Sequence, residues 1–276
     1  MPKRKPPHKP GSRRRAGPKS PGARQGRGRQ SSNIRGRQSS NIMWLYGLHA
    51  VAAAINNPAR RKFRLLTTGE GKFQLDEDGQ EITETLARRV LEELLPPGAV
   101  HQGVALEVLA LEAVDLGAIT NGAADDAMIV LLDQASDPRN IGAVMRSAAA
   151  FGAAALLLPD RHAPEVTGVL AKAASGALER LPLVRITNVA SALRDLKDAG
   201  FWCIGLDVDA DTSLAAAAIP GRVALVIGSE GRGLRHLTAE KCDALAAIPM
   251  RAEAGSLNLA AATAIALYEL RREITP

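Results

Sequence analysis

The stretch that decides the fold reads VALVIGSEGRGL over Val223–Leu234 and AIPMRAEAGSLNLAAATAIALYEL over Ala247–Leu270. Two short apolar runs, 223–227 and 246–250, read as strands that each break into a polar, glycine-bearing turn before a helix. Where strands end and helices begin in an α/β sheet, backbone N–H groups can hold a small ligand. A matching turn, DQASDPRNIGAVMR at Asp133–Arg146, lies upstream. We therefore look for the function in these three loops.

Composition limits the class of protein. The 276 residues suffice for one large or two modest domains, and with 3% aromatic residues the core must be aliphatic. No apolar run reaches the length of a membrane span, and the basic N-terminal segment lacks the apolar core of a secretory signal, so we expect a soluble, cytoplasmic protein. Cys203 and Cys242 are far apart in apolar surroundings, which predicts buried free thiols. The histidines show no metal-ligand spacing, so no metal site is expected.

The net charge of +6 is concentrated in residues 1–42, which hold thirteen Lys and Arg and no acidic residue. The other 22 basic and 29 acidic residues give the rest of the chain a net charge of −7. A segment of Pro, Gly, Ser, Arg and Lys cannot bury enough surface to offset its ordering entropy, so we expect disorder. RGRQSSNI at 27–34 is repeated at 35–42. We interpret the segment as a polyanion-binding arm for RNA; the alternative is a solubilising tail without a specific partner.

The rest of the chain divides into two parts. Residues 43–113 read as a small α/β domain, and 114–126, rich in Gly, Ala and Asp, as a linker. From 127 to 276, short apolar strands alternate with helices, which predicts a mostly parallel sheet covered on both faces. The elements expected in order are helix 48–56, strand 64–68, helix 81–95, strand 104–109, strand 128–132, helix 141–150, strand 154–158, helix 164–175, strand 183–186, helix 189–199, strands 202–206, 223–227 and 246–250, and helix 257–272.

The glycine-rich loop Gly228–Leu234 contains neither the dinucleotide fingerprint nor a phosphate loop. Glu230 at the tip of the preceding strand can accept hydrogen bonds, pair with an arginine or face a cation. The alternative is that Glu230 only fixes the loop, and without the rest of the pattern this alternative is favoured.

The other two loops carry polar residues at helix starts. Asn140 is interpreted as a helix N-cap, and Arg146, six residues on, as either a functional cation or a surface ion-pair partner. Ser256 and Asn258 flank Leu257 at the next helix start, where both residue types commonly cap. Each pattern taken alone is weak evidence for a site.

Together the loops resemble the motifs of the SpoU (TrmH) branch of the knotted methyltransferases, which methylate a ribose 2′-hydroxyl of RNA. The three matching motifs, in order, are DPRNIGAVMRSAAAFGA (Asp137–Ala153), ALVIGSEGRGLRHLT (Ala224–Thr238) and IPMRAEAGSLNLAAATAIALYE (Ile248–Glu269). The segments 46–51, 100–104 and 172–188 are also similar to the family, so the resemblance covers about 44–270. The most similar group methylates guanosine in large-subunit (23S) rRNA, and tRNA-modifying relatives follow.

The resemblance implies an α/β fold with a deep trefoil knot near the C-terminus, and a homodimer whose active sites lie near the subunit interface. It implies S-adenosylmethionine, bound between the second and third motif loops and held largely by backbone. The implied cofactor contacts are Gly228, Ile248 and Leu257, with Met250 and Gly205 nearby. The reaction is an in-line displacement that needs no metal.

The resemblance also assigns catalytic roles. Arg146 is implied as the activator of the ribose hydroxyl. Because a guanidinium is a very poor base, we expect Arg146 to hold the adjacent phosphate and stabilise the developing alkoxide. Asn140 is expected to orient Arg146 or the ribose, whereas Glu230, Ser256 and Asn258 would fix the motif loops and the nucleotide. The small domain and the basic arm are expected to hold an RNA loop that presents the guanosine.

Two sites, one of them a pair of residues, depart from the family pattern. Ala252 stands where the family usually has glycine, and Leu259-Ala260 where it has a Val-Ser pair. Because Ser256-Leu257-Asn258 is intact, we expect activity to be retained. The alternatives are a tRNA 2′-O-methyltransferase of the same family, a non-catalytic RNA-binding or ribosome-assembly factor, and a nucleotide-dependent dehydrogenase, against which the missing fingerprint argues.

Overall fold

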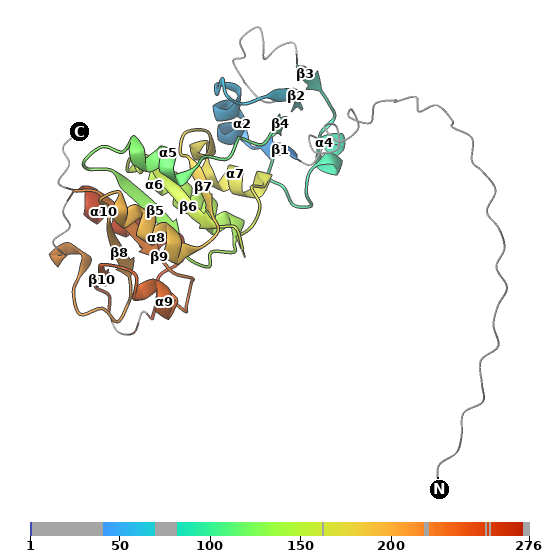
Figure 1. The fold of residues 1–276 in the computed structure, drawn as a ribbon. Helices are drawn as coiled ribbons and strands as arrows, with labels where there is room; N and C mark the ends of the chain where they lie inside the picture. Colours follow the sequence, from blue (N-terminus) through green and yellow to red (C-terminus); the bar gives the residue numbers. More distant parts are fainter. Residues whose placement is uncertain are drawn as a thin grey trace. The chain divides into compact units, whose positions relative to one another are not determined.

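Six short apolar strands pair in parallel, in the order β10–β8–β9–β5–β6–β7. Their bounds are β5 Met128–Leu132, β6 Ala155–Pro159, β7 Leu183–Ile186, β8 Trp202–Leu206, β9 Val223–Ile227 and β10 Ala244–Ala246. Every residue of β5, β6 and β9 is buried. This burial confirms the predicted parallel sheet with two covered faces. Figure 1 shows the arrangement in this computed structural model.

The structure describes Met1 and residues 41–69, 82–161, 163–217, 221–251, 253 and 255–272. The chain divides into a unit up to Ser40 and a unit Asn41–Pro276. The predicted arm, apart from its ends, and the departure at Ala252 lie outside the described residues. No helix in the described part of the chain combines the length and apolarity needed to cross a bilayer.

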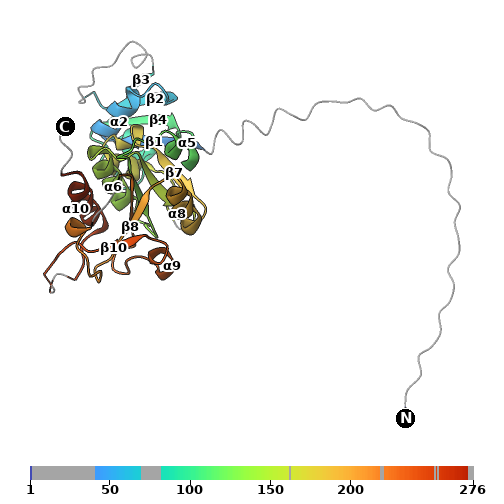
Figure 2. The same cartoon turned by 60° about the vertical axis from the view of Figure 1, so that its left-hand side comes forward.

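Helices cover the two faces of the large sheet. Met128, Val130 and Leu132 of β5 pack in one core cluster with α6 (Pro138–Ala150), α7 (Gly168–Ala174) and α10 (Leu259–Arg271). Ile129 and Leu131 pack on the opposite face against α8 (Val189–Asp198). Figure 2 shows α6 and α10 along one flank of the sheet and α8 along the other. This alternation of β5 side chains follows from the twofold period of a strand.

A smaller sheet is formed by the segment before residue 110, with strand order β1–β4–β2–β3. Its elements are β1 Ile42–Tyr46, α2 Leu48–Ile55, β2 Lys62–Thr67, β3 Thr83–Thr85, α4 Arg88–Leu94 and β4 Val104–Leu109. The β1 and β2 strands pair antiparallel with β4, and β3 pairs parallel with β2. Strand β1 was not predicted from the sequence, although its pairing with β4 completes the small sheet.

Three predicted elements differ from the structure. The helix predicted over 81–95 begins only at Arg88, because the β-branched pair Thr83 and Thr85 forms β3 beside β2. The predicted linker contains a short helix, α5 (Leu116–Asn121), whose N-cap Asp115 accepts a hydrogen bond from Gly117 N at 2.8 Å. The last strand, predicted over 246–250, is β10 and ends at Ala246; Pro249, which has no N–H for a ladder, lies beyond it. The other predicted elements occur, several strands with the predicted bounds and the helices with shifted ends.

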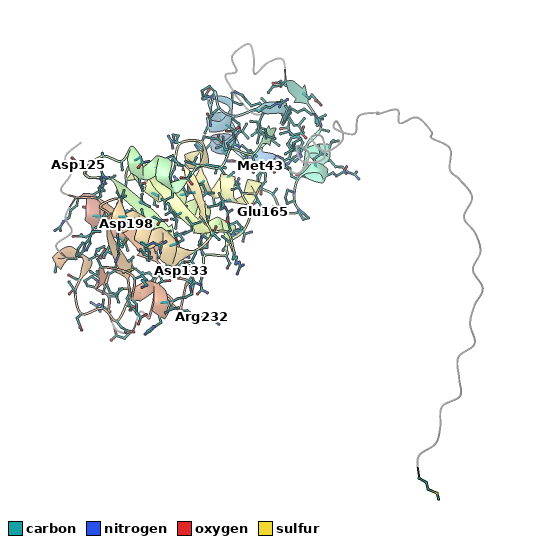
Figure 3. All side chains as sticks on the ribbon, in the orientation of Figure 1. Met43, Asp125, Asp133, Glu165, Asp198 and Arg232 are labelled. Atoms are coloured by element: carbon teal, nitrogen blue, oxygen red, sulfur yellow. The ribbon has the colours of Figure 1, made fainter. Side chains whose placement is uncertain are left out.

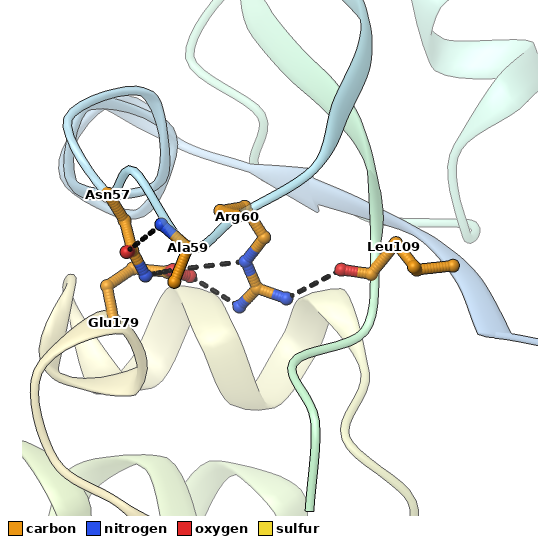
Figure 4. A network of polar contacts seen from close by, with 5 residues as sticks. All are labelled: Asn57, Ala59, Arg60, Leu109 and Glu179. Carbon is orange, nitrogen blue, oxygen red and sulfur yellow. Dashed lines mark hydrogen bonds and ion pairs between the residues drawn. The ribbon is translucent and has the colours of Figure 1, made fainter.

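A buried ion pair joins the small sheet's segment to the large one. Arg60, 2% exposed, donates from Nη2 and Nε to the Glu179 carboxylate at 2.6 and 3.0 Å. The Arg60 Nη1 donates to Leu109 O at 2.9 Å, and Asn57 Nδ2 donates to Glu179 Oε2 at 2.7 Å (Figure 4). Glu179 ends the 3₁₀ helix η2 (Ala177–Glu179), which follows α7. The Glu179 carboxylate is thus satisfied entirely from the preceding part of the chain.

Both cysteines are free thiols, as predicted. Cys203 on β8 is buried, and Cys242 is half-buried. Burial, followed by the nearby Asp243 carboxylate, raises the pKa of Cys203 to about 12. Burial likewise raises the pKa of Cys242 to about 12. Both thiols therefore stay protonated at neutral pH.

Candidate active site and cofactor cavity

Side chains from the three motif loops meet beyond the ends of the parallel strands. Asn258 Nδ2 lies 3.2 Å from Asn140 Oδ1 and 3.2 Å from Glu230 Oε1. Asn140 Nδ2 closes the triangle by donating to Glu230 Oε2 at 3.3 Å. The three residues are at least 28 positions apart in sequence. Two amides and one carboxylate therefore cross-link the loops that the sequence analysis singled out.

The start of α6 explains how Asn140 reaches Glu230. The interpretation of Asn140 as the N-cap is wrong, because Asp137 is the N-cap and accepts a hydrogen bond from Arg139 N at 2.8 Å. Pro138 follows at the first helical position, where its missing N–H costs nothing. Asn140 thus lies inside the first turn, and its amide can bond outside the helix.

Asn258 is the N-cap of α10, as its position suggested. Its Oδ1 accepts from Ala260 N at 2.9 Å and Ala261 N at 3.4 Å, which leaves Nδ2 for Asn140 and Glu230. One side chain therefore both starts the final helix and joins it to the two earlier loops. Glu230 fixes the loops by accepting from these two amides.

Asp133 is a site-supporting residue that sequence reasoning missed. This fully buried carboxylate follows β5 and accepts from Arg235 Nη2 and Nε at 2.6 and 2.9 Å. Thr238 Oγ1 donates to it at 2.8 Å. These bonds hold the segment after Gly228–Leu234, including α9 (His236–Ala239), against the end of β5. Figure 3 labels Asp133 on the fold. An acidic residue directly after an all-apolar strand was the available signal.

A cavity of about 550 Å³ opens beside the cross-linked loops. Its lining residues are Leu206, Asp207, Val208, Asp209, Ile227, Gly228, Ser229, Glu230, Gly231, Arg232, Gly233, Ile248, Met250, Gly255, Ser256, Leu257, Leu259 and Ala262. The predicted cofactor residues Gly228, Ile248, Met250 and Leu257 are all among them. The predicted Gly205 is not in this lining; a Cβ there would lie 2.6 Å from Leu234 Cδ1 and 2.7 Å from Leu245 Cδ2.

Gly228 is required by close backbone packing. A Cβ at this position would lie 2.0 Å from both C and O of Gly233. The loop folds back on itself because Ser229 and Gly233 exchange two backbone hydrogen bonds of 3.0 Å. The turn therefore brings main-chain groups to the cavity wall, where a bulkier side chain would block them.

The cavity's chemistry suits a nucleoside with a cationic side chain. Ile248, Met250 and Leu257 supply an apolar wall, and the volume is within the usual range for small-ligand sites. The carboxylates of Asp207 and Asp209 lie on the same lining and favour positive charge. S-adenosylmethionine, with an adenine ring and a sulfonium, matches both features.

Arg146 lies outside the cavity that contains Gly228, Ile248, Met250 and Leu257. It lines a second cavity of about 550 Å³, formed by His49, Arg146, Ala149, Ala150, Ala153, Ser175, Arg180 and Leu181. The two cavities share no residue. Arg146 lies six positions after Asn140 on α6, a rise of about 9 Å along the helix axis. The structure therefore joins Asn140, Glu230 and Asn258 by hydrogen bonds and places Glu230 and Ser256 on the lining of one cavity, but it leaves Arg146 outside that cavity.

The sequence model of the SpoU rRNA methylase family matches residues 127–268, which include all three motif loops and the large sheet. The chain belongs to this family. The α/β fold with a parallel sheet is thus that of a SpoU methyltransferase, as the motif resemblance implied.

Relatives of the chain carry more specific names. The 23S rRNA (guanosine-2′-O-)-methyltransferase RlmB of Xylella fastidiosa (strain 9a5c) is 38% identical over 241 residues, covering 84% of this chain and 97% of that protein. The RlmB of Xanthomonas axonopodis pv. citri (strain 306) is 37% identical over 244 residues, covering 85% and 98%. The SpoU methyltransferase AviRb of Streptomyces viridochromogenes, solved with the cofactor AdoMet, superimposes with a TM-score of 0.70 at 27% identity, covering 88% of this chain and 94% of AviRb.

Proposed function

We propose that this SpoU-family protein methylates the ribose 2′-hydroxyl of a guanosine in 23S rRNA, using S-adenosylmethionine. The observation that carries the proposal is the cavity lined by Gly228, Ile248, Met250 and Leu257 beside the Asn140–Glu230–Asn258 triangle. Relatives with the matching name align over 97% and 98% of their own length, which supports the substrate class.

The cavity residues would hold the cofactor by shape and main-chain contact. The apolar side chains of Ile248, Met250 and Leu257 would enclose the adenine, and the turn at Gly228 would present backbone donors and acceptors. Gly205 would act from behind the wall by allowing Leu234 to pack closely. When bound, S-adenosylmethionine supplies an electrophilic methyl group, so the protein's task is orientation.

The polar residues would position the loops, contact the nucleotide and bind the phosphate. Asn140, Glu230 and Asn258 would keep the loops in register, and Ser256 on the cavity lining would contact the nucleotide. Arg146 would bind the phosphate beside the target ribose and stabilise the oxygen as its proton leaves. Its charge is permanent, so this electrostatic role suits it better than that of a base.

A homodimer is part of the proposal. Arg146 and the cofactor cavity of one chain belong to separate cavities, so an active site near a subunit interface could bring a second Arg146 to the cofactor. The exposed apolar residues Ile265 and Tyr268 on α10 provide a face for such an interface. A trefoil knot that holds α10 against α6, and a cytoplasmic location, complete the proposal.

We further propose that residues 43–113 form an RNA-binding domain and that residues 1–42 act as a polyanion-binding arm. Deleting 1–42 should weaken RNA binding and reduce its salt dependence, because the arm holds thirteen cations. Unchanged binding and unchanged salt dependence would instead identify this segment as a spacer.

Nucleoside mass spectrometry tests the reaction directly. Unmodified rRNA and tRNA would be incubated separately with the full chain and S-adenosylmethionine, then digested to nucleosides. We expect 2′-O-methylguanosine from rRNA alone. Methylation of tRNA alone would overturn the substrate but keep the chemistry. Cofactor binding without ribose methylation of either RNA or of ribosomal particles would favour the non-catalytic RNA-binding alternative.

A further inference from the structure

Arg180 lies between two cavities. The first is the cavity that contains Arg146, and the second measures about 880 Å³. The lining of the second is Met43, Asn57, Ala59, Arg60, Arg61, Leu109, Ala110, Leu111, Glu112, Ala113, Val114, Val166, Leu178, Glu179, Arg180, Leu181, Pro182, Leu183 and Arg185. Arg180 and Leu181 belong to both linings, so the cavities adjoin there. Together they run from the small sheet's segment to the motif helix α6.

The charges along this path are mostly positive. Arg61, Arg180 and Arg185 line the larger cavity, and the smaller one adds Arg146. The acidic side chains of the two linings are Glu112 and Glu179, and both oxygens of Glu179 are occupied by Arg60 and Asn57. An anion entering this path therefore meets one exposed carboxylate and several guanidinium groups.

Of these guanidinium groups, those of Arg146 and Arg180 are available for a ligand, whereas those of Arg185 and Arg61 already have partners. Arg185 donates to Pro164 O at 2.6 Å, and Arg61 lies over the Phe63 ring at 5.2 Å. By contrast, the side chains of Arg180 and Arg146 have neither an ion-pair nor a hydrogen-bond partner in the described part of the chain. Both are exposed at the surface of their shared cavity. A planar guanidinium with free N–H groups is well suited to bind phosphate oxygens.

The backbone that carries Arg180 is held firmly. Glu179, the residue before it, is clamped by Arg60 in an ion pair whose side chains are 1% and 3% exposed. Arg180 N also donates to Ala177 O at 3.0 Å. A cation on such an anchored segment loses less freedom when it binds an anion than one on a mobile loop.

We propose that Arg180 is a phosphate-binding residue on a track that leads a single-stranded segment of the substrate RNA from the larger cavity to Arg146. This inference rests on the proposed RNA methyltransferase function and adds the path and a positioning residue to it. Ala149, Ala150 and Ala153 line the smaller cavity and leave space for a ribose. Val166, Leu178 and Leu183 give the larger cavity an apolar wall against which an unstacked base can pack.

The test compares R180A with wild type and with the matched control R194A. Arg194 is a 69%-exposed arginine on α8 that lines neither cavity. The probe is an unmodified transcript of 23S rRNA, and the readouts are equilibrium binding at several salt concentrations, S-adenosylmethionine affinity and melting temperature. We expect R180A to raise the Kd for the transcript about tenfold. The salt slope, meaning the slope of log K against the logarithm of the salt concentration, should become shallower by about 0.7. The affinity for S-adenosylmethionine and the melting temperature should stay unchanged. R194A should behave as wild type, and R180K should recover the salt slope because it keeps the charge.

Each outcome decides between the proposals. If R180A binds the transcript as tightly as wild type, with the same salt slope, the track is wrong even when methylation proceeds. If wild type binds the transcript without methylating it and R180A weakens that binding, the track stands and the methyltransferase proposal falls. If wild type does not bind the transcript, or if R194A weakens binding as much as R180A, the assignment to Arg180 is overturned.

Discussion

Glu230 Oε1 and Asn258 Nδ2 lie 3.2 Å apart, although one residue follows β9 and the other begins α10. The same carboxylate accepts from Asn140 Nδ2 at 3.3 Å. A single acidic side chain therefore connects all three motif loops beside the cavity in which we propose that the cofactor binds.

Substituting Glu230 by alanine tests the connection. In E230A both amides lose their acceptor, the loops lose their relative order, and we expect S-adenosylmethionine affinity to fall about tenfold. Isothermal titration measures the change. E240A is the control, since Glu240 is exposed on the segment after α9 and its Oε1 atom lies 3.6 Å from His236 Nδ1, away from the triangle. Equal affinities for E230A and wild type would show that the triangle does not shape the cavity.

Substituting Arg146 by alanine should reduce turnover without changing cofactor binding. In R146A we expect methyl transfer to fall by at least about a hundredfold, because the group that stabilises the developing alkoxide is lost. The Kd for S-adenosylmethionine should stay unchanged, since Arg146 does not line the cofactor cavity. Single-turnover kinetics and titration measure the two quantities. A parallel loss of cofactor affinity would contradict the assignment.

Gly228 should not tolerate a methyl group. The added Cβ of G228A would meet Gly233 backbone atoms at 2.0 Å, so the loop must move, and we expect a loss of at least about 2 kcal/mol in unfolding free energy. Cofactor binding should fall as well. At Gly122 the corresponding Cβ would lie 3.8 Å from Ala118 O, so G122A serves as the control in the same denaturant titration. A G228A protein as stable as G122A would refute the close approach.

The Arg60–Glu179 pair offers a comparison between buried and exposed ion pairs. In R60A the Glu179 carboxylate stays buried without its partner, and we expect about 3–5 kcal/mol of destabilisation. The exposed pair Arg64–Glu84, with N and O atoms 2.9 Å apart and side chains 44% and 46% exposed, provides the control R64A, which should unfold as wild type does. Urea denaturation measures both, and similar midpoints for R60A and R64A would contradict the argument.

The raised pKa values of the two thiols predict how labelling rate and stability depend on pH. Because burial raises the pKa values of Cys203 and Cys242 to about 12, both should react slowly with iodoacetamide in the native protein at pH 8 and rapidly after unfolding. The unfolded thiols ionise near pH 9, so their contribution to stability is complete below pH 9 and is lost as the pH rises toward 12. Fast native labelling at pH 8 would show that the thiols are accessible.

The local patterns predicted much of the fold. Apolar runs such as Met128–Leu132 and Val223–Ile227 are found as buried parallel strands with the predicted bounds. The helix predicted over 81–95 failed because β3 gains its hydrogen bonds from β2, a partner that a local pattern does not reveal. The same reason explains why β1 was missed, since its pairing with β4 joins residues 59 to 67 positions apart.

The site residues show the same division. The sequence by itself determined which side chains the three loops carry, because a strand that ends in a polar turn before a helix is a local pattern. Only the tertiary structure decided that Asn140 bonds Glu230 rather than caps its helix, and that Arg146 faces a different cavity. A hydrogen bond between residues 90 positions apart depends on how strands are ordered in the sheet, and that order is set by packing over the whole chain.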